Sequence, residues 1–478
     1  MSLLRSYLKV AAVRDGRAQR ATTVRHVHLA DAPLVFVPLR LAGEAAAPLA
    51  AMVGDDRAHP HLLVVTNPRN RDERFAFMAE LAEVVVSYIE RFTTQVEMSD
   101  TRTPYERCLD APQILVPNPA GVAFTRLLGR STRFRKIEGP HAVPPRVPLL
   151  GRWLTFLHDR SEFADSAMLL AMTGLLSEHW VTGQSAAEDA KLSTQLAWID
   201  PPHGLTGAEA AVQAEDPLRS PPAGPDTDPG FDHAVLQPLI GGYGVTAQLR
   251  EALHEQLEPT WNDMWQAVDL LRPLPEGASV AARWERDRAA LAWHQRWLTD
   301  GGLPQGRLDS AVAAARRLAT LEAAQQSYEA NRAFDDPLVM ADYRAAGVAF
   351  AGRVIAVEAD RKITPPGGKR AVLRPLVSVR TDDSVRLSPG TRLLSPARPK
   401  QKAHLESVEG DVAVLQLNGG LGKGTTLPGV GEIICYADLD PEGHRHPSLP
   451  DLADTPWTHG GPPAEYVPTD EDAQEVWS

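Results

Sequence analysis

Residues 418 to 429, NGGLGKGTTLPG, follow an apolar run and contain the glycines and the lysine of a phosphate-binding loop. Such a loop needs a lysine that reaches the β and γ oxygens and, directly after it, a hydroxyl residue that holds the metal ion. Here Gly424 separates Lys423 from the next threonine, and Pro428 and Gly429 interrupt the helix that should follow. We therefore predict a glycine-rich hairpin between two strands, in which Lys423 meets a phosphate other than that of ATP.

Other sequence motifs are incomplete in the same way. HEQLE at 254 to 258 lacks the second histidine of a zinc protease helix, and DLDPEG at 438 to 443 lacks the final carboxylate of a calcium loop. The sequence thus contains no intact catalytic, nucleotide-binding or metal-binding motif. We expect no metal, no cofactor and no catalytic residue.

Two clusters of basic residues remain as candidates for phosphate contact. Residues 353 to 402 hold twelve Lys or Arg and four Asp or Glu, although the net charge of the chain is −12. Cations arrayed on a small β-barrel are what contact with a nucleic-acid backbone requires. The residues expected to make this contact are Arg374, Arg380, Arg386, Arg392, Arg398, Lys400, Lys402 and Lys423, joined in a second cluster by Arg126, Arg130 and Arg133. The alternative is a solvated surface that pairs with the acidic remainder of the chain.

Strand alternation in RAVLRPLVSVR indicates how the barrel presents these cations. Period-two spacing places Leu373, Val377 and Val379 on one side and Arg374 and Arg380 on the other. The stretch between the nearest flanking aromatics, at positions 350 and 436, contains no Phe, Trp or Tyr to stack on bases. This favours contact with the backbone of a nucleic acid, or with a protein, over base stacking.

The elements that must position these residues suggest an α+β, multi-domain protein. Apolar, β-branched runs alternate with helical periodicity near the N-terminus, helical patterns follow, and six short strand-like runs lie after Pro337. The predicted units are a small α/β unit at 1–150, a helical region at 151–213, a Pro/Asp-rich linker at 214–232, a Trp-rich helical region ending in a long helix at 233–340, a basic β-barrel at 341–440 and a disordered, acidic, Pro/Gly-rich tail at 441–478.

A rival site lies in the N-terminal α/β unit. Ligands of open α/β sheets bind beyond the carboxyl ends of the strands. Asn67, Arg69 and Arg71 follow the strand-like run at 62–66, and Asn118 lies at the end of the run QILVPNP at 113–119. If these four side chains converge, an enzyme or ligand sensor is favoured.

Cellular location is inferred from the cysteines and the apolar segments. Two widely separated cysteines, Cys108 and Cys435, do not make a disulfide framework. The N-terminal stretch is interrupted by Arg5, Lys9 and Arg14, unlike a signal peptide, and the most apolar window, 167–176, is about half the length of a membrane span. We expect a cytoplasmic protein without a membrane partner.

The helix GRLDSAVAAARRLATLEAAQQSYEANRAF, followed by strands from GVAFAGRVIAVE to GEIICYADL, resembles the stalk and β-barrel insertion of superfamily 1 helicases over residues 305 to 440. The resemblance is one of element order and turn rhythm. In that family the barrel helps to grip nucleic acid and a motor core follows, whereas too few residues follow here for such a core. The resemblance implies a motor-less companion of a separate ATPase or helicase chain.

These observations support three hypotheses. The first is a non-catalytic accessory protein of a nucleic-acid-processing, helicase-linked assembly, with DNA or RNA bound by the barrel. The second is an enzyme or ligand sensor at the strand ends of the N-terminal unit. The third is a protein scaffold in which neither basic cluster forms a continuous surface.

Overall fold

The computed structural model describes residues 2–242, 245–306, 309–364, 367, 369–422, 426–443 and 450–454. Its central element is a five-stranded sheet in the order β4-β3-β2-β7-β8. The strands are β2 (Leu34–Arg40), β3 (Pro48–Gly54), β4 (His61–Val64), β7 (Ile114–Val116) and β8 (Leu169–Ala171). β2, β7 and β8 run parallel, and β3 runs antiparallel to both of its neighbours. β2 and β4 therefore end at the same edge of the sheet.

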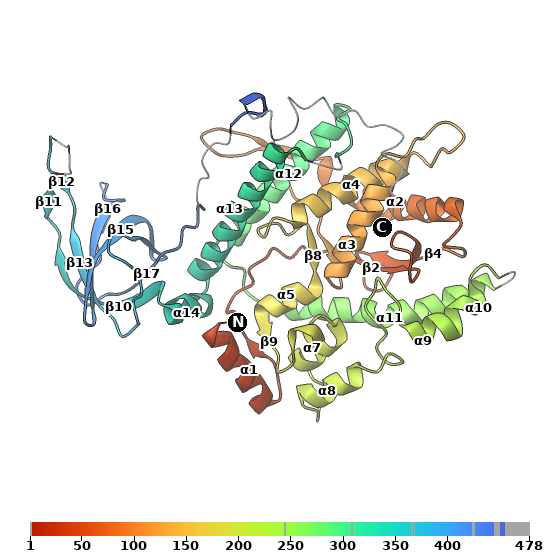
Figure 1. Cartoon of the computed structure of the whole chain (residues 1–478), viewed down its shortest axis with the longest axis horizontal. Coiled ribbons are helices and arrows are strands. Elements are labelled where there is room, and N and C mark those ends of the chain that lie inside the picture. Colours follow the sequence, from red (N-terminus) through yellow and green to blue (C-terminus); the bar gives the residue numbers. More distant parts are fainter. Residues whose placement is uncertain are drawn as a thin grey trace.

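Helices cover both faces of this sheet, so the main body has three layers (Figure 1). Along β2, alternate side chains enter two different hydrophobic cores, Leu34 and Phe36 in one and Val35 and Val37 in the other. The first core is closed by α2 (Arg71–Thr93), α3 (Pro119–Thr132), α4 (Arg146–Ser161) and α12 (Val280–Thr299). The second is closed by α5 (Met172–His179), α7 (Leu192–Ile199), α8 (Gly207–Ala214) and α11 (Thr246–Leu271).

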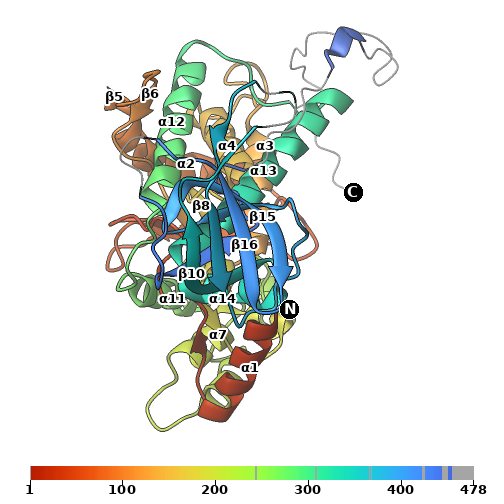
Figure 2. The ribbon, with the colours of Figure 1, turned by 90° about the vertical axis from the view of Figure 1, so that its left-hand side faces the viewer.

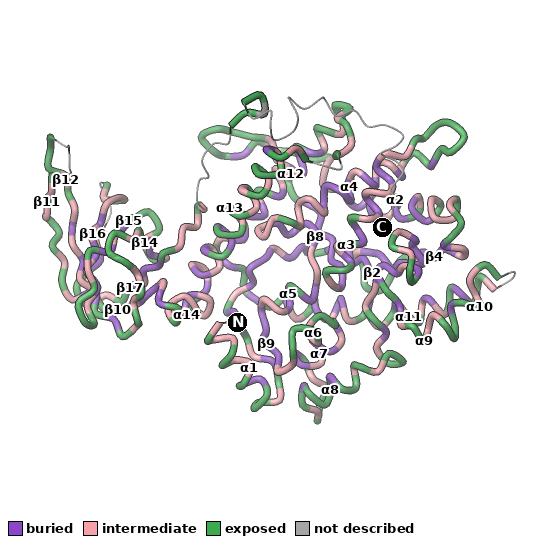
Figure 3. Tube along the Cα trace, viewed as in Figure 1, coloured by how far each residue is buried: buried purple, intermediate pink, exposed green. Residues whose placement is uncertain are grey.

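Local sequence explains where these helices begin. Asn70 caps α2 by accepting hydrogen bonds from the backbone amides of Asp72 and Glu73, and Asn118 caps α3 in the same way. In α2, apolar residues at three- and four-residue spacing, from Met78 to Ile89, are buried against the sheet. The helix predicted after residues 62–66 is thus present. The sheet and its inner helix faces are the buried centre of the molecule (Figure 3).

Shorter elements lie around the three layers. The N-terminal helix is α1 (Leu3–Asp15), which is followed by β1 (Gln19–Arg20), paired with β9 (Trp180–Val181). The others are β5 (Val96–Met98) paired with β6 (Glu106–Cys108), α6 (Ala186–Asp189), α9 (Pro229–Phe231), the π-helix η1 (Asp232–Leu236) and α10 (Gln237–Leu239).

Two consecutive helices lead from the main body to the C-terminal strands (Figure 1). The long helix α13 (Ala311–Asp335) is capped by Ser310, and α14 (Pro337–Ala346) begins two residues after it ends. Asp336 caps α14, and proline at the first helical position fits there because that residue's N–H would be unpaired in any case. The break at Asp336 changes the direction of the chain.

The C-terminal strands form a closed six-stranded barrel in the order β10-β13-β16-β15-β14-β17. They are β10 (Ala349–Glu358), β13 (Leu376–Arg380), β14 (Arg392–Ser395), β15 (Arg398–Glu409), β16 (Val412–Gly419) and β17 (Ile433–Ala437). A two-stranded ribbon, β11 (Lys362–Ile363) and β12 (Val372–Leu373), extends from one end. The barrel stands to one side of the main body, and Figure 2 views the molecule from that side.

The mixed α/β fold and the six-strand C-terminal sheet are confirmed. The glycine-rich segment differs from the prediction: it joins β16 to β17, which are not neighbours in the barrel, so it is a crossing loop and not a hairpin. The two main cores extend from Ala12 to Leu274 and from Leu34 to Ala292, and so both cross residue 150. The division into units stays a prediction.

Part of the predicted tail is described. The Ser327 hydroxyl of α13 donates to the carbonyl oxygen of Pro441 at 2.6 Å, and Arg316 lies 3.7 Å from Asp451, just before the 3-10 turn η2 (Leu452–Asp454). Residues 444–449 and 455–478, on which most of the predicted disorder falls, lie outside the described residues.

Candidate nucleic-acid interface

Three of the predicted barrel arginines form ion pairs with nearby carboxylates. The pairs are Arg380 with Asp411 at 3.2 Å, Arg392 with Asp440 at 3.0 Å and Arg398 with Glu432 at 2.5 Å. A second Arg398 nitrogen donates to the other Glu432 oxygen at 2.9 Å. The guanidinium of Arg398, together with the backbone amide of Gly429, holds the pKa of Glu432 below its usual value. These three arginines are therefore already neutralised in part.

The remaining predicted cations of the barrel are less engaged. Lys400, Lys402 and Arg386 are exposed, and their side chains have no hydrogen-bond or ion-pair partner among the described residues. Arg374 donates to the carbonyl oxygen of Leu373 at 2.9 Å. Lys423 lies outside the described residues. Lys400 and Lys402 are thus the predicted residues best placed to accept an external anion.

Polar side chains form a row across the outside of β16 and β15. Arg361 donates from Nη1 to Oε1 of Gln416 at 2.8 Å, and Nε2 of Gln416 donates to Oδ1 of Asn418 at 2.9 Å. Asn418 in turn contacts the imidazole of His404. Lys402 lies two residues before His404 on the same outer face of β15. We call Arg361, Gln416, Asn418, His404 and Lys402 the outer row.

The outer row points outward because neighbouring residues fill the barrel. Ala403 and Leu405 of β15 and Leu415 and Leu417 of β16 are fully buried, and strand alternation turns the residues between them to the outside. Register holds the row together, since Gln416 lies opposite His404 in the paired strands. Two amides and an imidazole thus follow the Arg361 guanidinium in one chain of contacts, and Lys402 is on the same outer face of β15.

Four members of the outer row, all except Lys402, were not among the predicted site residues. Arg361 lies before the ribbon, and its approach to Gln416 depends on how the ribbon folds back, which no sequence period indicates. The alternation in VAVLQLNG does place Gln416 and Asn418 on the side opposite the buried leucines. That signal could have identified these two amides from the sequence.

The run RAVLRPLVSVR differs from the predicted single strand. β12 ends at Leu373 and β13 begins at Leu376, with Pro375 between them. Proline cannot donate a ladder hydrogen bond, which explains the interruption. Val377 and Val379 are buried as predicted, but Leu373 is 36% exposed because it belongs to the ribbon and not to the barrel.

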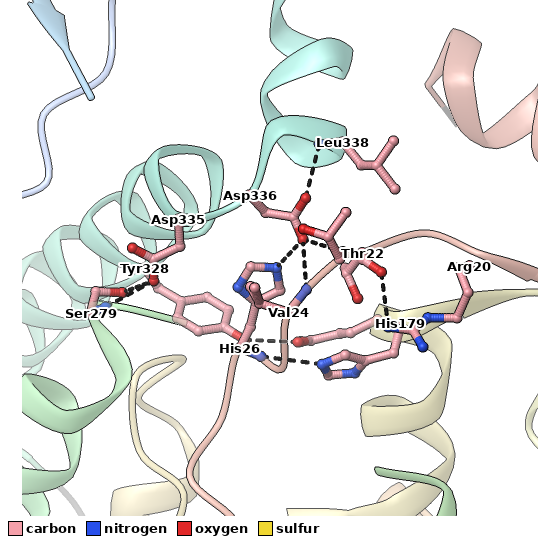
Figure 4. A network of polar contacts seen from close by, with 12 residues as sticks. Arg20, Thr22, Val24, His26, His179, Ser279, Tyr328, Asp335, Asp336 and Leu338 are labelled. Carbon is pink, nitrogen blue, oxygen red and sulfur yellow. Dashed lines mark hydrogen bonds and ion pairs between the residues drawn. The ribbon is translucent and has the colours of Figure 1, made fainter. Parts of the chain in front are cut away.

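A buried polar cluster attaches the junction of α13 and α14, the helices that precede the barrel, to the main body (Figure 4). Asp336, the cap of α14, accepts hydrogen bonds from the backbone amides of Thr23 at 2.6 Å and Val24 at 3.3 Å, and from Leu338 at 2.9 Å. His26 Nε2 lies 3.4 Å from the carboxylate oxygen that faces the N-terminal segment. Burial alone would raise the pKa of Asp336, but these contacts outweigh it and hold the pKa well below its usual range.

Two further contacts extend this cluster. The backbone amide of His26 donates to Nε2 of His179 at 3.2 Å, while Nδ1 of His179 donates to the carbonyl oxygen of Leu175 at 2.8 Å. Burial lowers the pKa of His179 to about 4, so its imidazole is neutral at pH 7. Arg283 of α12 donates to the carbonyl oxygen of His26 at 2.6 Å. His26 therefore connects the N-terminal segment to α5, to α12 and to the α13–α14 break. Figure 4 shows its contacts with His179 and Asp336.

The second predicted cluster is divided between surface and interior. Arg126 of α3 is exposed and Arg130 is half-buried. Arg133 is only 2% exposed and donates to the carbonyl oxygen of Gln305 at 2.9 Å. Arg133 thus connects α3 to the segment that follows α12, and it does not share an open surface with Arg126.

The four residues of the rival site contact different partners, and their convergence on one ligand stays a prediction. Asn67 accepts from the backbone amide of Arg69, and Arg69 pairs with Glu44 at 2.9 Å. Asn118 caps α3 and donates to the carbonyl oxygen of Gly224 at 2.7 Å. Arg71 lines a cavity between α2 and α3.

In the part of the chain that the structure describes, no helix is long and apolar enough to cross a membrane. No three His, Cys, Asp or Glu side chains gather there as a metal site. No protein-family model matches the chain, and no curated protein matches it significantly.

Proposed function

We propose that the chain is a non-catalytic accessory protein of a nucleic-acid-processing, helicase-linked assembly, in which the barrel contacts the phosphate backbone of DNA or RNA. The observation that carries the proposal is the outer row, together with the ammonium group of Lys400, which is also on β15. Lys400 and Lys402 have no partner among the described residues, and the row supplies hydrogen-bond donors beside them. Phosphate contacts of this kind bind without reading sequence.

An exposed apolar stripe on α1 supports the protein-partner part of the proposal. Leu3, Tyr7, Val10 and Val13 recur at three- and four-residue spacing and are all exposed, whereas Ala11 and Ala12 face the interior. Contiguous apolar surface of this kind favours contact with another protein. The separate ATPase or helicase chain suggested by the resemblance is one such partner.

A cytoplasmic location belongs to the same proposal. Cys108 and Cys435 are both free thiols in the structure, which fits a reducing compartment. The α1 stripe and the barrel would then act in the compartment where nucleic acid is processed.

Salt-dependent binding of the full-length protein tests the proposal. Fluorescence anisotropy with single- and double-stranded oligonucleotides should give an affinity that falls as salt rises. Replacing Lys400 and Lys402 together by alanine should weaken binding. The slope of log affinity against log salt should also become shallower, by roughly 0.7 to 0.9 for each phosphate that the variant no longer neutralises.

Arg353→Ala is the matched control for this experiment. It removes a positive charge from β10 of the same barrel, where the guanidinium donates to the carbonyl oxygen of Gly431 at 2.9 Å. We expect a small change in affinity. Binding that is absent, insensitive to salt, or equally weakened by the control and the lysine variant would contradict the proposal.

A further inference from the structure

A cavity of about 200 Å³ lies between the first turns of α2 and the last turns of α3. One wall includes Pro48, the first residue of β3, which is paired with Arg40, the last residue of β2. The cavity is therefore at the edge where the parallel strands β2 and β4 end. In open α/β sheets this is the edge at which ligands bind.

The lining of this cavity carries positive charge and no carboxylate. Arg71 and Arg74 come from α2, Arg135 follows α3, and the hydroxyl residues Ser131 and Thr132 complete the polar lining. The nearby acid Glu73 does not line the cavity, because its carboxylate accepts hydrogen bonds from the Thr66 hydroxyl and the Asn67 amide at 2.5 and 2.7 Å. Arg71 forms an ion pair with Asp72 at 2.8 Å, so its charge is already neutralised in part.

Two of these guanidinium groups are held against an aromatic ring. The guanidinium carbon of Arg71 lies 4.7 Å from the ring centre of Phe75, and that of Arg135 lies 5.3 Å from it. Arg71 also donates to the carbonyl oxygen of His141 at 2.7 Å, and Arg135 donates to that of Ser131 at 2.9 Å. These interactions reduce the conformational entropy that the arginines give up when they bind a ligand.

Arg74 is the cation of the cavity that is left for a ligand. Its side chain is half-buried and makes no hydrogen bond or ion pair with the described residues. The first turn of α2 adds the positive end of a helix dipole beside it. A guanidinium group in this setting favours a phosphate, whose oxygens match its planar pair of N–H donors.

We propose that this cavity binds a phosphate monoester dianion. Its volume accommodates the phosphate. A second, more open cavity of about 530 Å³ shares Arg135 and is lined by Lys136 and Arg152 together with the acid Glu138. The phosphate is either the 5′ end of a nucleic acid or part of a small phosphorylated molecule. This inference is independent of the proposed role of the barrel, because none of its residues belongs to the barrel.

Calorimetric titration of the full-length protein with inorganic phosphate tests the site directly. Wild-type protein should bind phosphate, and Arg74→Gln should weaken the affinity at least tenfold. Arg102→Gln is the matched control, since Arg102 is exposed, lines neither cavity and has no hydrogen-bond or ion-pair partner among the described residues. Arg74→Lys keeps the charge but loses the two-pronged geometry, so we expect an intermediate affinity.

The source of the phosphate is distinguished by two oligonucleotides that differ only in a 5′-phosphate or a 5′-hydroxyl. If wild-type protein binds the 5′-phosphorylated strand more tightly and Arg74→Gln abolishes the difference, the site belongs to nucleic-acid ends. If both strands bind equally well while inorganic phosphate still binds, the site belongs to a small phosphorylated molecule. No phosphate binding in the millimolar range, or equal affinities of wild type and Arg74→Gln, would overturn the inference. Urea unfolding of each variant verifies that Arg74→Gln remains folded.

Discussion

The Nε2 atom of His26 lies 3.4 Å from a carboxylate oxygen of Asp336, and both side chains are completely buried. One residue belongs to the N-terminal segment of the main body and the other separates α13 from α14. The contact therefore fixes the point at which the chain leaves the main body for the barrel. Because the remaining polar contacts of Asp336 come from backbone N–H groups, every group facing this carboxylate is a donor or can act as one.

Asp336→Asn should destabilise the protein by about 3 kcal/mol, the range for breaking a buried charge interaction. Asparagine is also a good helix cap, so the change isolates the loss of charge from the loss of capping. Its NH₂ group must face an N–H donor in either orientation, because both oxygens of Asp336 accept from backbone amides. Urea unfolding monitored by tryptophan fluorescence measures the loss of stability.

Asp382→Asn serves as the control for this substitution, since Asp382 is exposed and makes no hydrogen bond or ion pair with the described residues. Its unfolding free energy should stay within about 0.5 kcal/mol of wild type. If Asp336→Asn were equally mild, the buried contact would contribute little to the attachment of α14.

Buried histidines should make the protein sensitive to acid. Burial lowers the pKa of His294 to about 3 and that of His179 to about 4. Each folded-state pKa lies below the unfolded value near 6.5, so the unfolded chain binds the proton more strongly. The contribution of each histidine to stability is complete above pH 6.5 and is lost as the pH falls toward the folded pKa.

His294→Phe should remove one of these acid-sensitive contributions. The imidazole of His294 stacks on Phe156 at 4.2 Å between ring centres, and its Nε2 atom has no hydrogen-bond partner in the described part of the chain. Between pH 7 and pH 4.5 the variant should become more stable relative to wild type by about 2 to 3 kcal/mol. Urea unfolding of both proteins at each pH gives the difference.

Comparing the variant with wild type cancels the other titrating groups. Asp263 is an example, because burial raises its pKa to about 6 and its contribution changes with pH in the opposite direction. A difference between the two proteins that stays constant with pH would show that His294 has an ordinary pKa.

Gly420→Ala should be strongly destabilising. Gly420 has a φ of +69°, and a Cβ atom there would lie 2.1 Å from the carbonyl oxygen of Lys400. The backbone conformation and the close approach both exclude a side chain, so we expect a loss of about 2 kcal/mol or more. Gly422 is in the same loop and a Cβ atom there meets nothing within 4 Å, so Gly422→Ala should be nearly neutral.

Thermal unfolding of the two glycine variants provides the comparison. If both alanine variants unfold at the same temperature, the approach of Gly420 to β15 does not stabilise the barrel. This glycine has a structural role that the resemblance of NGGLGKGTTLPG to a phosphate loop does not indicate.

The six barrel strands were predictable because most are rich in apolar, β-branched residues and glycine or proline separates each from the next. The order in which they pair was not, since it depends on contacts between distant segments. For that reason the link between β16 and β17 looked like a hairpin. The partners and the burial of charged residues were equally hard to predict. The arginines are visible in the sequence, but their positions do not indicate that Arg398 faces Glu432 or that Arg133 is buried.

Sites built from different elements were the hardest to predict. Arg71 was predicted from its place after a strand, whereas Arg74 and Arg135 share its cavity only because α3 ends beside the start of α2. Asn67 and Asn118 follow strands in the same way, yet their side chains satisfy local backbone groups. Asparagine before a helix is more often a cap than a ligand, and the sequence pattern alone does not separate the two roles.

Arg398 should stabilise the barrel more than it binds nucleic acid. Its guanidinium makes two hydrogen bonds to Glu432, and both side chains are partly buried. Arg398→Ala should therefore lower the free energy of unfolding by about 1 to 2 kcal/mol, because it removes a charge-assisted pair and leaves Glu432 with only the Gly429 amide. Lys402→Ala should show the opposite pattern, with unchanged stability and weaker oligonucleotide binding. Urea unfolding measures the stability of the two variants, and fluorescence anisotropy measures their oligonucleotide binding. If Arg398→Ala is as stable as wild type yet binds as poorly as Lys402→Ala, Arg398 belongs to the interface.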